Sequence, residues 1–161
     1  MSAPIQVLFV CLGNICRSPA AEAVFGEWLK HRDLVDKIQL DSAATADYHM
    51  GRPANIRMIR AAEARNIDMS TLRSRQVTKS DFNRFDWIVA MDHSNLTDLQ
   101  AMQPVNSCAH LCLMLDYPAA PQVQVPDPYY GEDSDFGHVL DLLQQACEPL
   151  YNRLVEDSRL A

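Results

Sequence analysis

The chain has 161 residues, of which 48% are hydrophobic and 22% are charged, and its formal net charge at pH 7 is −7. This composition is ordinary for a soluble globular protein, and we expect residues 1–161 to form a single domain. The acidic balance argues against nucleic acid and anionic membrane surfaces as main partners, because both carry negative charge. It does not exclude a local cationic pocket for a small anion.

Strand-like and helix-like segments alternate along the chain. Ile5–Val10 is short, apolar and rich in β-branched residues, which is typical of a buried strand. Ser18 and Pro19 then have the character of a helix N-cap and a first helical residue. In chain order we expect a helix over Ala20–His31, a strand over Lys37–Ser42, a helix over Pro53–Asn66, a short helix near Ser80, a strand over Asp86–Asp92, a helix over His93–Met102, a strand over Leu111–Leu115 and a helix over Asp135–Glu156.

This alternation predicts an α/β fold, with a parallel sheet and helices on both of its faces. In such folds ligands bind at the carboxyl ends of the strands. The segment Cys11–Arg17 lies at a place of that kind, because it follows the first strand and precedes the first helix.

The apolar N-terminal segment indicates a cytoplasmic protein. The run Ile5–Val10 has no Lys or Arg ahead of it and, at about six residues, is too short for a signal peptide or a membrane span. An odd number of cysteines in a cytosolic chain predicts free thiols rather than a disulfide framework. The five are Cys11, Cys16, Cys108, Cys112 and Cys147.

The segment Cys11–Arg17 begins with a thiol and ends with a guanidinium. A loop that leads into a helix directs backbone N–H groups and positive potential at one point, which suits an anion of phosphate size. In that place Cys11 is expected to be largely a thiolate, and Arg17 can bind two phosphoryl oxygens. The glycine patterns of nucleotide and dinucleotide sites are absent. The residues favour nucleophilic attack on phosphorus, and the alternative is a core cysteine followed by a surface arginine.

Asp127 is the candidate proton donor for a leaving phenolate or alkoxide. Prolines on both sides stiffen its loop, and Tyr129 and Tyr130 follow it and can line a cleft for an aromatic substrate. Without the first motif, the same segment would be interpreted as an ordinary turn with two surface tyrosines.

Together these motifs resemble the low-molecular-weight protein tyrosine phosphatase family. "CLGNICRSP" (11–19) is similar to the family's signature loop and "DPYYG" (127–131) to its general-acid loop. The segments "DSAAT", "GRP", "RQVTKSDF" and "MDHSNL" extend the resemblance over nearly the whole chain. It implies a three-layer α/β/α fold whose four-stranded parallel sheet has the order 2-1-3-4, a flavodoxin-like winding. It also implies hydrolysis of phosphotyrosine and small aryl phosphates through a cysteinyl-phosphate, without a metal or another cofactor.

The resemblance further implies a role for each residue of the site. Cys11 attacks phosphorus, and Asp127 protonates the leaving phenol and then acts as a base toward water. The residues implied in phosphate binding are Leu12, Gly13, Asn14, Ile15, Cys16, Arg17 and Ser18. Ser18 supports the thiolate, and Asn14 holds the loop with Ser42 among its neighbours. The residues corresponding to cleft walls are Leu12, Tyr48 and Tyr129.

Cys16 corresponds to a second loop cysteine that forms a reversible disulfide with Cys11, as a guard against over-oxidation. Asp92, at the end of an apolar strand, is expected to support the loop. Two positions depart from the family's pattern. Leu72 stands where many members carry a histidine of the loop-stabilising network, and Tyr48 where some have tryptophan.

Two other functions remain open from the sequence. A thiol-dependent arsenate reductase uses a related loop, and Cys108 and Cys112 are the candidates for its disulfide relay. A non-catalytic phosphate-binding module would need the loop, but it has no use for Cys11 and Asp127 as a pair.

We expect phosphotyrosine-containing proteins as partners, and a monomer with weak dimerisation as the alternative. We expect no metal site at "CAHLC" (108–112), because successive same-face residues of a strand lie too far apart for one zinc ion. His31, His49, His93 and His138 are expected at the surface or at helix ends.

Overall fold

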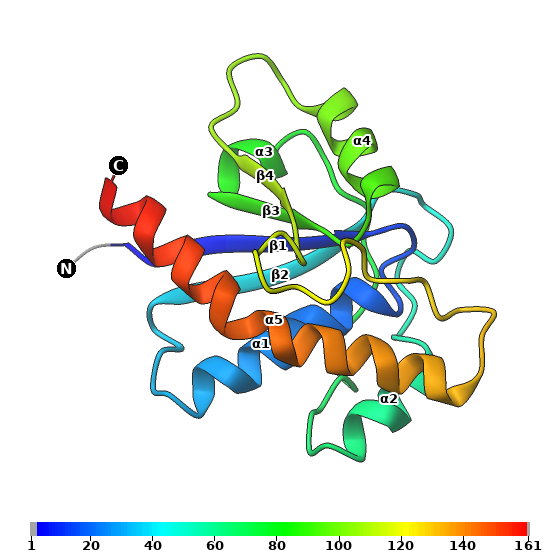
Figure 1. The fold of residues 1–161 in the computed structure, drawn as a ribbon. Coiled ribbons are helices and arrows are strands. Elements are labelled where there is room, and N and C mark those ends of the chain that lie inside the picture. Colours follow the sequence, from blue (N-terminus) through cyan, green and yellow to red (C-terminus); the bar gives the residue numbers. More distant parts are fainter. Residues whose placement is uncertain (1–2, 161) are drawn as a thin grey trace.

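A four-stranded parallel sheet in the order β2-β1-β3-β4 forms the middle layer of the molecule (Figure 1). The computed structural model describes residues 3–160, and side chains through residue 157. The strands are β1 (Ile5–Cys11), β2 (Ile38–Ala44), β3 (Trp87–Ala90) and β4 (His110–Leu113), and the helices are α1 (Arg17–Lys30), α2 (Ile56–Glu63), α3 (Asp81–Arg84), α4 (His93–Met102) and α5 (Asp133–Leu160). The expected fold class and strand order are confirmed.

β1 is an inner strand, and both of its faces are covered by helices. Helices α1, α2 and α5 cover one face of the sheet, and α3 and α4 cover the other (Figure 1). Val7 and Phe9 belong to the core cluster on the first face, and Leu8 and Val10 belong to the cluster on the second. All four side chains are fully buried. Because successive side chains of a strand alternate, one apolar run supplies both halves of the core, which explains why this segment lacks polar alternation.

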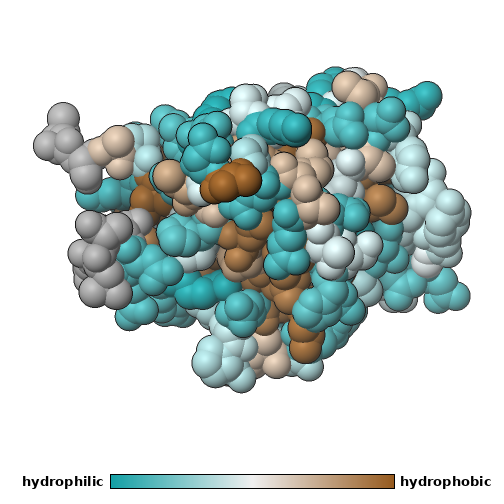
Figure 2. All heavy atoms as spheres, turned by 90° about the horizontal axis from the view of Figure 1, so that it is seen from above, coloured by the Kyte–Doolittle hydropathy of each residue, from teal (hydrophilic) through white to brown (hydrophobic). Residues whose placement is uncertain are grey.

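β4 is one of the two edge strands of the sheet, the other being β2, and its Leu111 and Cys112 are only partly buried. Figure 2 shows the molecule from above the view of Figure 1. On the face seen there, hydrophilic side chains surround a band of hydrophobic ones. Over residues 3–160, no helix combines the length and the apolar character that crossing a bilayer requires.

The start of the first helix differs from the expectation. α1 begins at Arg17, with Cys16 as its N-cap, so Ser18 and Pro19 belong to the first turn. Ser18 was wrongly predicted as the N-cap, because its hydroxyl is used by Cys11 and Asn14 instead. Pro19 fits inside the first turn, since the N–H that it lacks has no partner there.

α2 also begins later than expected. Its N-cap is Asn55, whose Oδ1 accepts the N–H of Arg57 at 2.9 Å. Pro53 was predicted to open the helix, but it pairs with Arg73 in an isolated antiparallel bridge. The chain between β2 and α2 is therefore held against residues 73–76, close to the carboxyl end of β1.

Candidate active site

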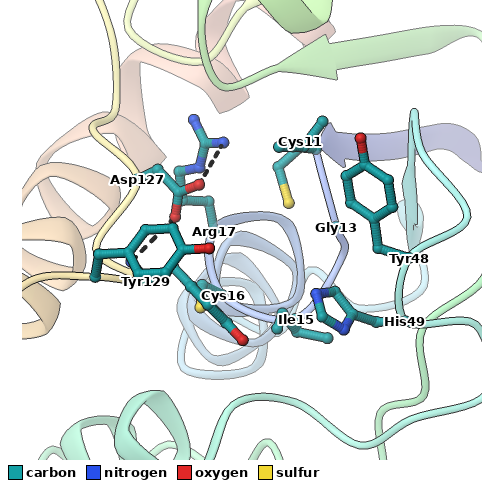
Figure 3. A pocket seen from close by; sticks show the side chains of 11 residues that line it. Cys11, Gly13, Ile15, Cys16, Arg17, Tyr48, His49, Asp127 and Tyr129 are labelled. Carbon is teal, nitrogen blue, oxygen red and sulfur yellow. Dashed lines mark hydrogen bonds and ion pairs between the residues drawn. The ribbon is translucent and has the colours of Figure 1, made fainter.

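A pocket of about 290 Å³ lies at the carboxyl end of β1 (Figure 3). Three segments far apart in the sequence form it: the loop after β1, the chain after β2 and the loop that carries Asp127. Its lining residues are Cys11, Leu12, Gly13, Ile15, Cys16, Arg17, Tyr48, His49, Asp127, Tyr129 and Tyr130. The structure therefore brings the three expected catalytic residues and all four expected cleft residues to one place.

The Cys11 sulfur receives hydrogen-bond donors from the loop that follows it. The N–H groups of Asn14 and Ser18 point at Sγ, at 3.3 and 3.4 Å, and the Ser18 hydroxyl lies 3.0 Å away. Cys11 is only 3% exposed, so bulk water contributes little to solvating this sulfur. Donors aimed at a buried sulfur stabilise its negatively charged form relative to the neutral thiol.

The carbonyl groups of the loop bond to neighbouring segments. Thr45 N–H donates to Cys11 O at 2.9 Å, and Ala46 N–H donates to Leu12 O at 3.0 Å. Because a peptide unit is planar, a carbonyl fixed on one side of the chain turns the next N–H to the other side. The loop thus directs N–H groups into the pocket, where they form an anion-binding nest.

Arg17 is 3% exposed and lies beside carboxylates from two other segments. Its Nη1 donates to Asp92 Oδ2 at 2.6 Å and to Val125 O at 3.1 Å, and its Nη2 lies 3.7 Å from Asp127 Oδ2 (Figure 3). Burial disfavours a charged guanidinium, but the charges of Cys11, Asp92 and Asp127 outweigh it and raise the pKa of Arg17. Asp92 thus orients a permanent cation beside the thiol.

Asp127 combines access to the pocket with a fixed backbone. Its side chain is 44% exposed, and its Oδ1 accepts the N–H of Tyr129 at 3.1 Å. One carboxylate oxygen is therefore used within the turn, and the other faces Arg17 and the pocket. A carboxyl group in this position can exchange a proton with a bound molecule.

Asn14 holds the loop by bonds of its side chain. Its Nδ2 donates to Ser18 Oγ at 2.7 Å, and its Oδ1 accepts the N–H of Arg75 at 3.1 Å. Ser42, expected among its neighbours, instead donates its hydroxyl to Glu22 of α1 at 2.7 Å. Successive side chains of a strand point to opposite faces of the sheet, and the side chain of Ser42 points to the face that α1 covers.

His49 lines the pocket, although its sequence context predicted a place at the surface or at a helix end. Its ring lies 6.0 Å from the ring of Tyr129 and 6.4 Å from that of Tyr48, and it lines the pocket beside Gly13 (Figure 3). A Cβ added to Gly13 would lie 2.9 Å from His49 Cδ2, so a larger residue at this position would push the His49 ring aside. No motif singles out His49, because its position depends on the path of the chain after β2.

The sequence also did not predict that Arg75 and its two ion-pair partners, Asp41 and Asp81, support the site. Its guanidinium lies 3.0 Å from Asp41 of β2 and 3.0 Å from Asp81 of α3. These ion pairs fix residues 74–76 against the sheet, next to the loop that holds Cys11. "RQVTKSDF" contains Arg75 and Asp81, but the sequence does not show that Asp41 closes the network.

Cys16 lies in the pocket wall and is 4% exposed. Burial, together with the charges of Cys11 and Asp127, raises its pKa to about 12. At neutral pH, the Cys16 side chain is therefore an uncharged thiol in the wall of the pocket that contains Cys11. Among the described side chains, no three of the types His, Cys, Asp and Glu are grouped so that they could hold a metal ion.

Comparison with known proteins decides the family. A family model described as low molecular weight phosphotyrosine protein phosphatase matches residues 6–160. The chain belongs to this family. The human low molecular weight phosphotyrosine protein phosphatase is 44% identical over 144 residues, which cover 88% of this chain and 90% of the human protein.

Bacterial and protozoan members of the phosphatase family are similar along almost their whole length. The Bacillus subtilis low molecular weight protein-tyrosine-phosphatase YfkJ is 37% identical over 157 residues, which cover 97% of this chain and 99% of that protein. The crystal structure of a protein tyrosine phosphatase from Entamoeba histolytica superposes with a TM-score of 0.90 at 41% identity, covering 96% of this chain and 99% of that one. This chain is a phosphatase of the hydrolytic, cysteine-dependent kind, and arsenate reduction is not favoured.

The partly buried carboxyl group of Glu22 gives a prediction about stability. Burial raises the pKa of Glu22 above 4.5, so the folded chain holds this proton more tightly than the unfolded chain does. This tighter binding of the proton stabilises the folded chain fully below about pH 4.5, where Glu22 is protonated in both states. The stabilisation is lost as the pH rises through the folded-state pKa of Glu22. We expect Glu22→Gln to remove this loss, so that its free energy of unfolding exceeds the wild-type value by a margin that grows from pH 4.5 to neutrality. Urea unfolding at a series of pH values measures the margin.

Glu63→Gln is the matched control, because Glu63 is exposed on the neighbouring helix α2. Its margin over the wild type should stay flat over the same pH range. A flat margin for Glu22→Gln as well would contradict the prediction.

Proposed function

We propose that this phosphatase hydrolyses phosphotyrosine in other proteins, and small aryl phosphates, in two steps with Cys11 as the nucleophile. The observation that carries the proposal is the convergence of Cys11, Arg17 and Asp127 on one pocket. The names of the relatives support the substrate class, since they describe phosphotyrosine or protein-tyrosine phosphatases.

In the first step the Cys11 thiolate attacks phosphorus in line with the bond to the phenol oxygen. A sulfur–phosphorus bond forms, the phosphorus–oxygen bond breaks, and the protonated carboxyl of Asp127 gives its proton to the leaving oxygen. Arg17 and the N–H groups of residues 12–18 bind the three remaining oxygens, where charge accumulates in the transition state. The products of this step are a cysteinyl-phosphate and the dephosphorylated phenol, which is a tyrosine side chain when the substrate is a protein.

In the second step water replaces the sulfur. Asp127, now a carboxylate, takes a proton from the attacking water, and the bond between phosphorus and Cys11 breaks. The Ser18 hydroxyl, 3.0 Å from Sγ, donates to the departing thiolate. Inorganic phosphate leaves, and both the thiolate and the protonated Asp127 are restored.

The walls of the pocket favour an aromatic substrate. Leu12, Tyr48, His49 and Tyr129 stand around the entrance, while Cys11 lies at the base and is almost fully buried. A phosphoryl group bound to the loop thus places its phenyl ring between apolar and aromatic side chains. The side chain of phosphoserine is shorter and presents no ring to these walls, so aryl phosphates should be preferred.

The mechanism is tested by replacing the nucleophile and the acid. We expect Cys11→Ser to abolish hydrolysis of p-nitrophenyl phosphate, and Asp127→Ala to lower kcat by about 10²–10⁴-fold while phosphate still inhibits by binding. Steady-state kinetics with phosphate as a competitive inhibitor measure both effects. Asp133→Asn is the matched control, because Asp133 is exposed at the start of α5 and should leave kcat unchanged.

Full activity in Cys11→Ser would contradict the proposed nucleophile. Production of arsenite from arsenate, with stoichiometric oxidation of thiols, would favour the reductase instead. Phosphate binding without any turnover of aryl phosphate would favour a non-catalytic binding module.

The proposal includes a redox guard formed by Cys11 and Cys16. Peroxide oxidises the Cys11 thiolate to a sulfenic acid with release of hydroxide, and the Cys16 thiol then attacks that sulfur, forms a disulfide and releases water. The pKa of Cys16, raised to about 12 by burial and by the charges of Cys11 and Asp127, keeps it from reacting with peroxide itself. The disulfide stops oxidation of Cys11 before the irreversible sulfinic acid.

We therefore expect dithiothreitol to restore the activity of the wild type after peroxide treatment, but not that of Cys16→Ser. Activity assays before and after reduction measure the difference, and Cys147→Ser, which replaces a buried cysteine of α5, is the control. Permanent inactivation of the wild type, with both loop cysteines present, would contradict the guard.

We also propose that the protein works in the cytoplasm, on phosphotyrosine-containing proteins, as a monomer with weak self-association as the alternative. Five free cysteines support a reducing compartment. The net charge of −7 supports protein substrates rather than nucleic acid.

A further inference from the structure

The loop that holds Cys11 is supported by a side chain from outside it that no motif predicts. Ser74 lies before Arg75, in the chain between α2 and α3, and is 5% exposed. Its hydroxyl donates to the carbonyl oxygen of Gly13 at 3.0 Å. The other loop carbonyls described above accept from backbone N–H groups, so this bond can be removed by a substitution without changing the backbone.

The backbone of Ser74 is fixed on both sides of its side chain. Its N–H donates to Arg52 O at 2.8 Å, and its own carbonyl accepts the N–H of Gly51 at 2.7 Å. The ion pairs of Arg75 hold the next residue against the sheet. The direction of the Ser74 hydroxyl is therefore set before any substrate binds.

The bond matters because of what lies at the other end of the same peptide unit. The carbonyl of Gly13 and the N–H of Asn14 belong to one planar group, and the N–H of Asn14 points at Cys11 Sγ from 3.3 Å. A donor on the carbonyl side fixes the N–H on the opposite side. Ser74 thus determines where one of the donors to the sulfur points, although it lies outside the loop itself.

This peptide unit needs to be held, because Asn14 has a φ of 55°. Asparagine adopts this left-handed conformation more readily than most residues do, but it still favours right-handed backbone unless its surroundings hold it there. The side chain of Asn14 is bonded to Ser18 and to the N–H of Arg75, which fixes one end of the unit. Ser74 fixes the other end. Leu72, two residues earlier, packs against the core and offers the loop no polar group.

We infer that Ser74 is a positioning residue for the phosphatase reaction: its hydroxyl orients the peptide between Gly13 and Asn14 so that the N–H stabilises the Cys11 thiolate. The inference rests on the proposed role of Cys11 as the nucleophile. Without the hydroxyl, the partly buried Gly13 carbonyl loses its side-chain donor, and the peptide unit is free to turn its N–H away from the sulfur. The thiolate then loses one of its donors, so it is less stabilised both as the nucleophile and as the leaving group of the second step.

The test compares Ser74→Ala with Ser74→Thr, which keeps a hydroxyl, and with Ser70→Ala. Ser70 is the matched control, because it is exposed in the same segment and its hydroxyl bonds to Asp68. We expect Ser74→Ala to lower kcat for p-nitrophenyl phosphate about tenfold, with a smaller change in KM, as the loss of one hydrogen bond to a charged site implies. Ser74→Thr should recover most of this loss, and Ser70→Ala should match the wild type.

The deciding measurement is the pH dependence of Cys11 alkylation by iodoacetamide, which reports thiolate directly. Its midpoint should move to higher pH in Ser74→Ala and return toward the wild type in Ser74→Thr. Thermal unfolding of each variant shows how much of each protein is folded. An unchanged midpoint in folded Ser74→Ala overturns the inference, even if activity falls, because a purely structural role would leave the thiolate as it was.

The alkylation profile also separates this inference from the proposed function. If the wild type shows no hydrolysis of aryl phosphates, the proposed function is wrong, while the shift in the midpoint still decides whether Ser74 orients the donor. If the wild type hydrolyses them and Ser74→Ala equals Ser70→Ala in both assays, only the inference about Ser74 is wrong.

Discussion

The hydrogen bonds that reach the Cys11 sulfur set the conditions for everything else in this site. A buried negative charge is costly unless donors replace the water that it has lost. Two N–H groups and one hydroxyl do so here, and Arg17 adds a positive charge nearby. The loop must therefore turn its N–H groups inward and place Asn14 in a left-handed conformation, and it can do so only while neighbouring segments hold its carbonyl groups and side chains.

The fold supplies these neighbours because β1 is an inner strand of a parallel sheet. The carboxyl ends of adjacent strands meet at one edge, so Thr45 after β2 and Asp92 after β3 both reach the loop that follows β1. Asp127 reaches the same edge from the loop between β4 and α5. Sheet order and catalysis are thus linked: another strand order would leave Arg17 without Asp92, or the pocket without its acid.

Much of this arrangement follows from the sequence, because its signals are local. The apolar run of β1 and the segment Cys11–Arg17 predict a strand and an anion-binding loop without further information. The pairing of that loop with Asp127 could be proposed because each residue suits one half of the same reaction. The resemblance to a known family then supplied the strand order.

What the sequence did not reveal depends on contacts between distant segments. Ser74 and His49 belong to irregular stretches whose path is set by the bridge between Pro53 and Arg73, and no periodicity reports such a path. Ser18 was misplaced for a related reason: a serine before proline fits the pattern of an N-cap, but the need to solvate a buried sulfur determined its role. Functional demands override local preferences where the two compete.

The central claim is that Cys11 becomes covalently phosphorylated during turnover. Acid quenching of Asp127→Ala during reaction with an aryl phosphate, followed by mass spectrometry of its peptides, tests it most directly, because loss of the base slows hydrolysis of the intermediate. The account predicts one phosphoryl group on the peptide that contains Cys11, and none in a variant that also carries Cys11→Ser. Turnover with no phosphoryl group on Cys11, or with the label on another residue, would contradict it.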